Sequence, residues 1–176
     1  MYGSKEIKPG RYREEIGRTY DDFVVGDVYE HRPGRTITDA DNVWFTLLTM
    51  NQHPLHFDAE YAKKSEFGRP LVNSCLTLSI VTGQSVTDLS QNALANLSWT
   101  VIQMPHPVFD GDTLYSRSEV LDVRESKSRP EVGIVRVRTT GVNQDGTTVL
   151  TFERTFMVYK RASAPSVGAV HVEAGR

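Results

Sequence analysis

The segments TMNQHPLHFD (49–58), FGRPLVNS (67–74) and CLTLSIVTGQS (75–85) decide how this chain folds. From residue 76 to residue 86, nearly every position is apolar or small, with Gln84 as the exception. A helix that is apolar all round is buried on all sides. Asn73 or Ser74 has the kind of side chain that caps such a helix at its start. The pattern therefore predicts a buried central helix over about 73–88.

After this helix, the chain changes to the two-residue period of β-strands. In GIVRVRTTGVN (133–143), for example, apolar and polar side chains alternate. The Asp145-Gly146 pair that follows is typical of a hairpin turn. Antiparallel strands that follow one buried helix predict an α+β fold in which the sheet wraps around the helix. We expect strands over residues 96–104, 113–123, 133–143 and 147–160.

The residues before position 50 carry a helix-start signal. Thr38 is a good N-cap, and Asp39 and Asp41 add negative charge in the first turn, where the helix dipole favours it. The helix is expected to stop near Met50, and Asp58 is expected to cap a second, short helix over 58–66. Apolar side chains follow the first cap at helical spacing: Val43, Trp44, Leu47 and Leu48.

The length of 176 residues favours a single domain. Residues 1–20 are polar and show no clear period, so we interpret them as an N-terminal arm. Residues 21–161 contain all the strand and helix signals and form the expected domain. Residues 162–176 are dominated by Ala, Gly, Ser and Val, which indicates a flexible C-terminal tail.

Composition argues against several classes of function. The net charge of −2 gives no general attraction to nucleic acid or to anionic membranes. No apolar run approaches the ~20 residues of a membrane span, and the N-terminus lacks the apolar core of a signal peptide. The single cysteine, Cys75, lies in an apolar run and is expected to be a buried, inert thiol. We therefore expect a cytoplasmic protein that binds neither nucleic acid nor a membrane.

The loop between the two helices has the side chains best suited to chemistry. His56 is a candidate general acid or base near neutral pH, or else a surface or capping histidine. His53 is a candidate to hold the Pro54 turn by a hydrogen bond. Asn51 cannot take up a proton, but its amide can orient a water, and it is also a common residue at helix ends. Two histidines without a third ligand cluster do not predict a metal site.

The start of the central helix is a second candidate for chemistry. Its first backbone N–H groups have no partner within the helix, and the helix dipole is positive there. A carbonyl group placed at this point would be polarised. Because every helix has this feature, it supports a site only together with the neighbouring loop.

Residues 49–83 resemble the hydratase segment of the MaoC-like dehydratases, the R-specific enoyl-CoA hydratase group of the hot-dog superfamily. The family pattern is Asp-x-Asn-Pro-(Ile/Leu)-His-x-Asp, and Pro54, Leu55, His56 and Asp58 match it. The segments FVVGDVYE and RTIT resemble the first strand of the family, and PVFDGD (107–112) resembles a later turn. The resemblance covers roughly residues 22–160 and implies a single hot-dog fold.

The sequence departs from the family pattern at the site itself. Asn51 stands where the family has its Asp, His53 stands in place of its Asn, and Asn73-Ser74 replaces a His-Gly pair. The variant N-x-H-P-L-H and the surrounding residues 40–62 resemble the mesaconyl-CoA hydratase-like (β-methylmalyl-CoA dehydratase-like) subgroup. In that subgroup an Asn-His pair appears in place of Asp-His, so we interpret Asn51 as a subgroup feature.

The resemblance implies reversible addition of water to a 2-enoyl-CoA. The acyl group would be short and branched or dicarboxylic, such as mesaconyl-CoA or itaconyl-CoA. His56 and Asn51 would be catalytic. The CoA thioester is the substrate, so neither a cofactor nor a metal is expected, and an exposed sheet edge would be covered in a homodimer or a higher homo-oligomer. Substrate contacts are expected from His53, Arg69, Asn73, Ser74, Cys75 and Thr82.

Two other functions fit the same fold. A thioesterase would need a carboxylate to activate water at the carbonyl carbon, and Asp58 and Glu66 are the nearest ones in the sequence. A non-catalytic acyl-CoA-binding subunit would bind the thioester without turnover.

Overall fold

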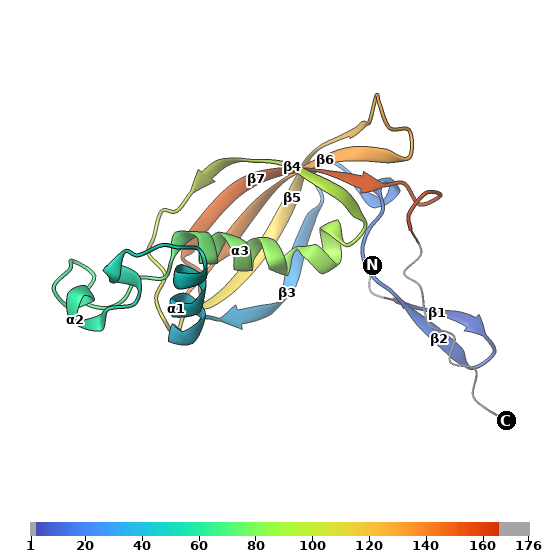
Figure 1. Cartoon of the computed structure of the whole chain (residues 1–176). Helices are drawn as coiled ribbons and strands as arrows, with labels where there is room; N and C mark the ends of the chain where they lie inside the picture. Colours follow the sequence, from blue (N-terminus) through green and yellow to red (C-terminus); the bar gives the residue numbers. More distant parts are fainter. Residues whose placement is uncertain (1–2, 166–176) are drawn as a thin grey trace.

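The computed structural model describes residues 3–165, and one antiparallel sheet forms the body of the molecule. The strand order is β3-β5-β6-β7-β4. The sheet is strongly curved, and the helix α3 (Ser74–Gln84) lies along its concave side (Figure 1). The expected α+β fold, with a sheet wrapped around a central helix, is confirmed. The strands are β3 (Val28–Thr36), β4 (Ala93–Gln103), β5 (Thr113–Glu125), β6 (Val132–Val142) and β7 (Thr148–Tyr159).

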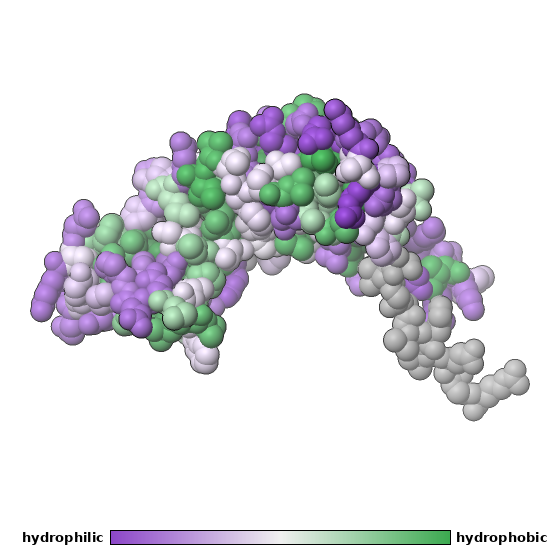
Figure 2. Space-filling model, turned by 45° about the horizontal axis from the view of Figure 1, so that its top comes forward, coloured by the Kyte–Doolittle hydropathy of each residue, from purple (hydrophilic) through white to green (hydrophobic). Residues whose placement is uncertain are grey.

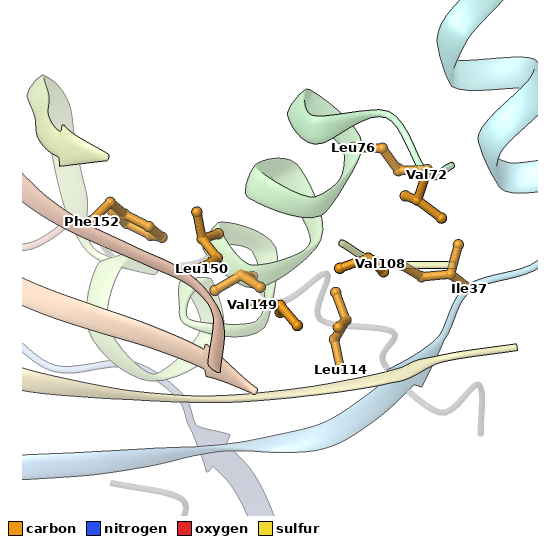
Figure 3. Close-up of a cluster of buried hydrophobic side chains, with 9 residues drawn as sticks. Ile37, Val72, Leu76, Val108, Leu114, Val149, Leu150 and Phe152 are labelled. Atoms are coloured by element: carbon orange, nitrogen blue, oxygen red, sulfur yellow. The ribbon is translucent and has the colours of Figure 1, made fainter. Parts of the chain in front are cut away.

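The main core lies between α3 and the concave face of the sheet (Figure 3). β7 alternates between buried and half-buried side chains along most of its length, as a strand with one covered face should. Leu76 and Val81 supply the helix side of this core. The sheet and loop side consists of Ile37, Val72, Val108, Leu114, Val149, Leu150 and Phe152.

The face of α3 that points away from the sheet is exposed, so the expectation of burial on all sides is wrong for the single chain. Ser74, Cys75, Ser79 and Gly83 are all exposed. The expected buried thiol of Cys75 is corrected for the same reason. Composition predicts that a helix must be covered, but it does not say whether the same chain supplies the cover. The helix itself ends close to the expected position, with a π-turn, η3 (Val86–Ser90), after α3.

The N-terminal residues form a small sheet of their own. β1 (Gly3–Lys8) and β2 (Arg11–Glu15) pair with each other as a hairpin, which lies apart from the five-stranded sheet (Figure 1). The polar sequence gave no strand signal there. The division into an arm, a domain and a tail remains a prediction, and residues 166–176 of the expected tail lie outside the described chain.

The two ends of the folded body are joined directly. The short 3₁₀ helix η1 (Tyr20–Asp22) packs on β6, where a side chain at Gly133 would place its Cβ 2.0 Å from the Tyr20 ring. The backbone N–H of Arg161 donates to Asp21 Oδ2 at 2.8 Å, and its guanidinium pairs with Asp22. The residues that lead into the sheet are therefore held by the residues that leave it.

A buried polar cluster lies where η3 meets the sheet. His31 Nε2 is 2.8 Å from Ser118 Oγ, and His31 Nδ1 is 3.7 Å from Asp88 Oδ2. Burial alone would raise the pKa of Asp88, but the neighbouring His31 and Arg18 side chains outweigh it and lower that pKa. This Ser-His-Asp order is that of a hydrolase triad. Ser118 is fully buried, however, so its hydroxyl is closed to substrate.

Arg154 on β7 is the largest fully buried side chain of the described chain, with 1% of its surface exposed. Its Nη2 donates to Ser85 Oγ at 3.1 Å, and its guanidinium lies 4.8 Å from the centre of the Phe156 ring. The Nε atom has no hydrogen-bond partner in the structure. Burial lowers the pKa of Arg154 to about 10. This cation is therefore buried with little compensation.

Candidate active site

The candidate site begins where α1 (Asp39–Leu48) ends. A capping box between Thr38 and Asp41 starts this helix, as expected. At the other end, Met50 adopts a left-handed conformation with φ 58°, and the Asn51 N–H donates to Thr46 O at 3.0 Å. This is a Schellman ending in which Met50 stands at the position where glycine is usual. It turns the chain sharply into the loop that carries the two histidines.

The loop is shaped by its own polar side chains. Asn51 Oδ1 accepts from the His53 N–H at 3.0 Å, and His53 Nδ1 accepts from the Leu55 N–H at 3.1 Å. His53 thus caps the 3₁₀ turn η2 (Pro54–His56), as expected of a residue that holds the Pro54 turn by a hydrogen bond. The described hydrogen bonds do not join Asn51 to His56. The Nδ2 group of Asn51 has no acceptor within residues 3–165 and is free to donate to a ligand or water.

His56 is half-buried and has a defined orientation. Its Nδ1 lies 2.8 Å from the backbone oxygen of Leu71. A carbonyl oxygen can only accept, so the hydrogen of neutral His56 lies on Nδ1 and its Nε2 is an unprotonated acceptor. The ring centres of His53 and His56 are 5.8 Å apart. Within residues 3–165, no group of three metal-binding side chains accompanies this pair.

A buried amide behind His56 was not expected from the sequence. Asn42, in α1, is 2% exposed. Its Nδ2 donates to His56 O at 2.9 Å and to Leu71 O at 3.1 Å, and its Oδ1 accepts from the Asn73 N–H at 2.8 Å. Asn42 therefore connects three segments of the site. In the sequence, Asn42 is marked only as a polar residue next to the apolar positions of the first helix.

The start of α3 lies next to this amide. Asn73 is the N-cap, and its Oδ1 accepts from the Cys75 N–H at 2.9 Å. Its Nδ2 donates to the buried Thr46 Oγ1 at 3.2 Å. Both polar groups of the Asn73 side chain thus bond within the protein, and its contact with substrate remains a prediction. The Ser74 N–H has no acceptor among the described residues, so it is the donor left for a ligand.

A cavity of about 250 Å³ opens beside the first turns of α3. Its polar side chains are Ser74, Thr77 and His106, and the remaining walls are apolar. Leu71, whose carbonyl accepts from His56 Nδ1, forms part of the wall, whereas His56 and Asn51 do not themselves line the cavity. The walls consist of Phe67, Leu71, Val72, Met104, Pro105, Pro107, Val108 and Val149 together with those polar residues.

Two other residues expected to contact substrate, Arg69 and Thr82, do not line the cavity. Arg69 is exposed, and its guanidinium stacks 3.9 Å from the centre of the Phe109 ring. Phe109 pairs with Leu71, which places Arg69 near the rim of the cavity. Thr82 does not line the cavity, because it lies two turns further along α3, where its Oγ1 is buried without a partner. Thr77 lines the cavity instead.

A family model described as mesaconyl-CoA hydratase matches residues 10–175 of this chain. The chain belongs to the mesaconyl-CoA hydratase family. Mesaconyl-CoA hydratase of Cereibacter sphaeroides is 34% identical over 86% of this chain and 44% of its own length. Beta-methylmalyl-CoA dehydratase of Chloroflexus aurantiacus is 35% identical over 82% of this chain and 41% of its own length.

Solved structures support the hot-dog fold of this mesaconyl-CoA hydratase family member. A Mycobacterium tuberculosis protein described as a double hot-dog fold is similar with a TM-score of 0.77 and 26% identity. The match covers 88% of this chain and 47% of that one. The chain thus spans less than half the length of these three relatives. The described residues form a single such fold, and none of their helices is long and apolar enough to cross a membrane.

Proposed function

We propose that this chain catalyses the reversible addition of water to the double bond of a short 2-enoyl-CoA. The observation that carries the proposal is the placement of His56. Its Nδ1 is fixed on Leu71 O, and Leu71 also lines the cavity beside the free N–H of Ser74. A base held by one wall residue of a small cavity and an oxyanion donor at another wall residue are parts that this reaction needs.

In the proposed mechanism, His56 Nε2 removes a proton from a water molecule, and the water oxygen bonds to C3 of the enoyl thioester. The electron pair of the double bond moves to C2 and onto the thioester oxygen as an enolate. The N–H of Ser74 donates to that oxygen, and the positive end of the α3 dipole stabilises its charge. His56 then returns the proton to C2, so the enzyme ends in its starting state.

Asn51 supplies an amide where the wider family has a carboxylate. Its Oδ1 is used by the His53 N–H, and its Nδ2 is free to donate to the oxygen of the attacking water. An amide orients water but does not take up the proton. All proton transfer is therefore assigned to His56.

The cavity favours a small acyl group. Its volume of about 250 Å³ is below the ~300–1,000 Å³ of sites for drug-sized ligands. A short branched acyl chain such as mesaconyl fits this size, and the apolar walls suit its methyl group. Arg69 at the rim is the cation proposed to meet a second carboxylate, and His53, beside His56, is proposed to contact the same carboxylate.

The decisive test is a panel of enoyl-CoAs, in which hydration removes the ultraviolet absorbance of the conjugated thioester. Mesaconyl-CoA, itaconyl-CoA and crotonyl-CoA are the first members of the panel. Turnover of at least one short substrate is expected, with short acyl chains preferred over long ones. Lack of turnover on every substrate, together with tight binding of the thioesters, would show a binding subunit instead.

Thioester hydrolysis has less support from the structure. Asp58 Oδ1 caps α2 (Ala59–Ala62) by accepting from the N–H groups of Glu60 and Tyr61, both at 3.0 Å. One oxygen of this carboxylate is therefore used to cap a helix, and both Asp58 and Glu66 are exposed. Release of free thiol at the rate of absorbance loss would identify a hydrolase.

We also propose that a second copy of the chain covers β4. Of the two edge strands, β3 exposes Glu30, Arg32 and Pro33, which discourage pairing. β4 instead exposes apolar side chains and is open on the side away from β7. Figure 2 shows apolar surface gathered in patches on the arched molecule. The exposed apolar side chains of β4 are Leu97, Trp99, Val101 and Ile102.

A charge on this strand should separate the copies. We expect light scattering to give a mass of twice the 19.8 kDa chain for the wild type and of one chain for Trp99→Lys. Tyr12→Lys, an exposed aromatic on the N-terminal hairpin, is the matched control and should remain dimeric. A dimeric Trp99→Lys variant would exclude β4 as the interface.

A further inference from the structure

We propose that Asn42 is a positioning residue that fixes both the tautomer of His56 and the start of α3. Its side chain makes three hydrogen bonds, to His56 O, Leu71 O and the Asn73 N–H. The first two hold the backbone of the base and the carbonyl that receives its ring. The third holds the residue before Ser74, whose N–H is the proposed oxyanion donor.

The carbonyl of Leu71 is the link between Asn42 and the ring. It accepts from His56 Nδ1 at 2.8 Å and from Asn42 Nδ2 at 3.1 Å, which occupies both of its lone pairs. Because Asn42 Nδ2 holds this oxygen in place, the ring of His56 has a fixed acceptor for Nδ1–H. In the neutral ring, Nε2 is then the unprotonated nitrogen. A base in the wrong tautomer cannot take a proton from water.

Asn is an unusual choice for this position on helical grounds alone. A buried interior position of α1 would ordinarily hold an apolar residue, and Asn is a weak helix former because its side chain competes for backbone hydrogen bonds. The cost of burying Asn42 in a helix is offset because both the N–H donors and the carbonyl acceptor of its amide have hydrogen-bond partners. An amide of this length supplies two N–H donors and one carbonyl acceptor together, and no apolar side chain of the same size does so.

Thr46 gives the matched control. It lies one turn after Asn42 on the same face of α1 and is also fully buried. Its Oγ1 bonds only to Asn73 Nδ2, so Thr46→Val disturbs the α3 side of the network and leaves the His56 side intact. Asn42→Asp keeps the size of the side chain and its acceptor, but it loses at least one of the two donated hydrogen bonds.

The test combines the ¹⁵N nuclear magnetic resonance of the histidine rings with kinetics. We expect the wild type and Thr46→Val to show His56 as a single Nδ1–H tautomer, and Asn42→Asp to show a mixture. Misplacement of a base costs about 10- to 100-fold in rate. Asn42→Asp should therefore lose about 10- to 100-fold in kcat with KM within about threefold of the wild type.

The kinetic part rests on the proposed function, whereas the spectroscopic part does not. Absence of turnover in the wild type would end the hydratase proposal and leave the tautomer measurement valid. If Asn42→Asp folds with an unchanged His56 spectrum, the positioning role is excluded. If that variant does not fold, the wild-type spectrum still tests the proposal. A wild-type His56 with its hydrogen on Nε2 would contradict it.

Discussion

Replacing His56 with glutamine is expected to lower kcat for hydration of a short enoyl-CoA by about 10²- to 10⁴-fold, the usual contribution of a general acid–base residue. Glutamine is of similar size and can form hydrogen bonds, but it cannot take a proton from water. The fall should be in kcat rather than KM, because the cavity walls are unchanged. Initial rates on the best enoyl-CoA of the panel measure both constants.

His53→Gln is the informative companion, because the two histidines lie with ring centres only 5.8 Å apart. His53 uses Nδ1 to cap the turn, so its loss should leave kcat within about an order of magnitude and act mainly on KM for dicarboxylic substrates. A His53 variant that loses more kcat than His56→Gln would reverse the assignment of the base.

Replacing Arg154 with methionine is expected to stabilise the fold by about 1–3 kcal/mol. Removing a poorly compensated buried charge in favour of an apolar side chain of similar volume is often stabilising. Arg154 has one hydrogen bond, to Ser85 Oγ, and an unpartnered Nε. Urea unfolding at neutral pH measures the change. Arg136→Met, on the exposed face of the neighbouring strand β6, is the control and should stay within about 0.5 kcal/mol of the wild type.

The pH dependence follows from the pKa of Arg154, which burial lowers from 12.5 to about 10. Below pH 10 the guanidinium is charged in both the folded and the unfolded states, so the full cost of burial, about 3 kcal/mol, is present. Above pH 10 the folded state loses the proton first and the cost decreases. The advantage of Arg154→Met should therefore be constant from neutral pH to about pH 10 and shrink above it. Destabilisation by this change would mean that the cation is well compensated.

The fold could be predicted because period and caps are local signals. The alternating strands and the Thr38 and Asp58 caps lie in the structure where the sequence indicated them. The orientation of α1 could not be predicted. Its apolar spacing marked the helix, yet Trp44 is 68% exposed and Leu48 is 73% exposed, whereas Asn42 and Thr46 point inward.

The candidate site was predictable only in part for the same reason. The chemistry of His56 and the free N–H groups at the start of α3 follow from residue type and helix geometry. The roles of Asn42 and Thr77 depend on which face of each helix meets the rest of the protein. The hydrogen bonds of Asn42 join residues from three separate segments of the chain, and such long-range bonds produce no periodic pattern in the sequence.

The join between η1 and the end of β7 affects how the chain folds as it is synthesised. The N–H of Arg161 and its acceptor Asp21 are 140 residues apart in the sequence. At about 5–20 residues per second, the ribosome needs roughly 7–28 s to make this intervening chain. For most of that time, until β6 (Val132–Val142) has been made, the Tyr20 ring has no β6 surface on which to pack. The first segment of the body to leave the ribosome is therefore among the last to reach its native position.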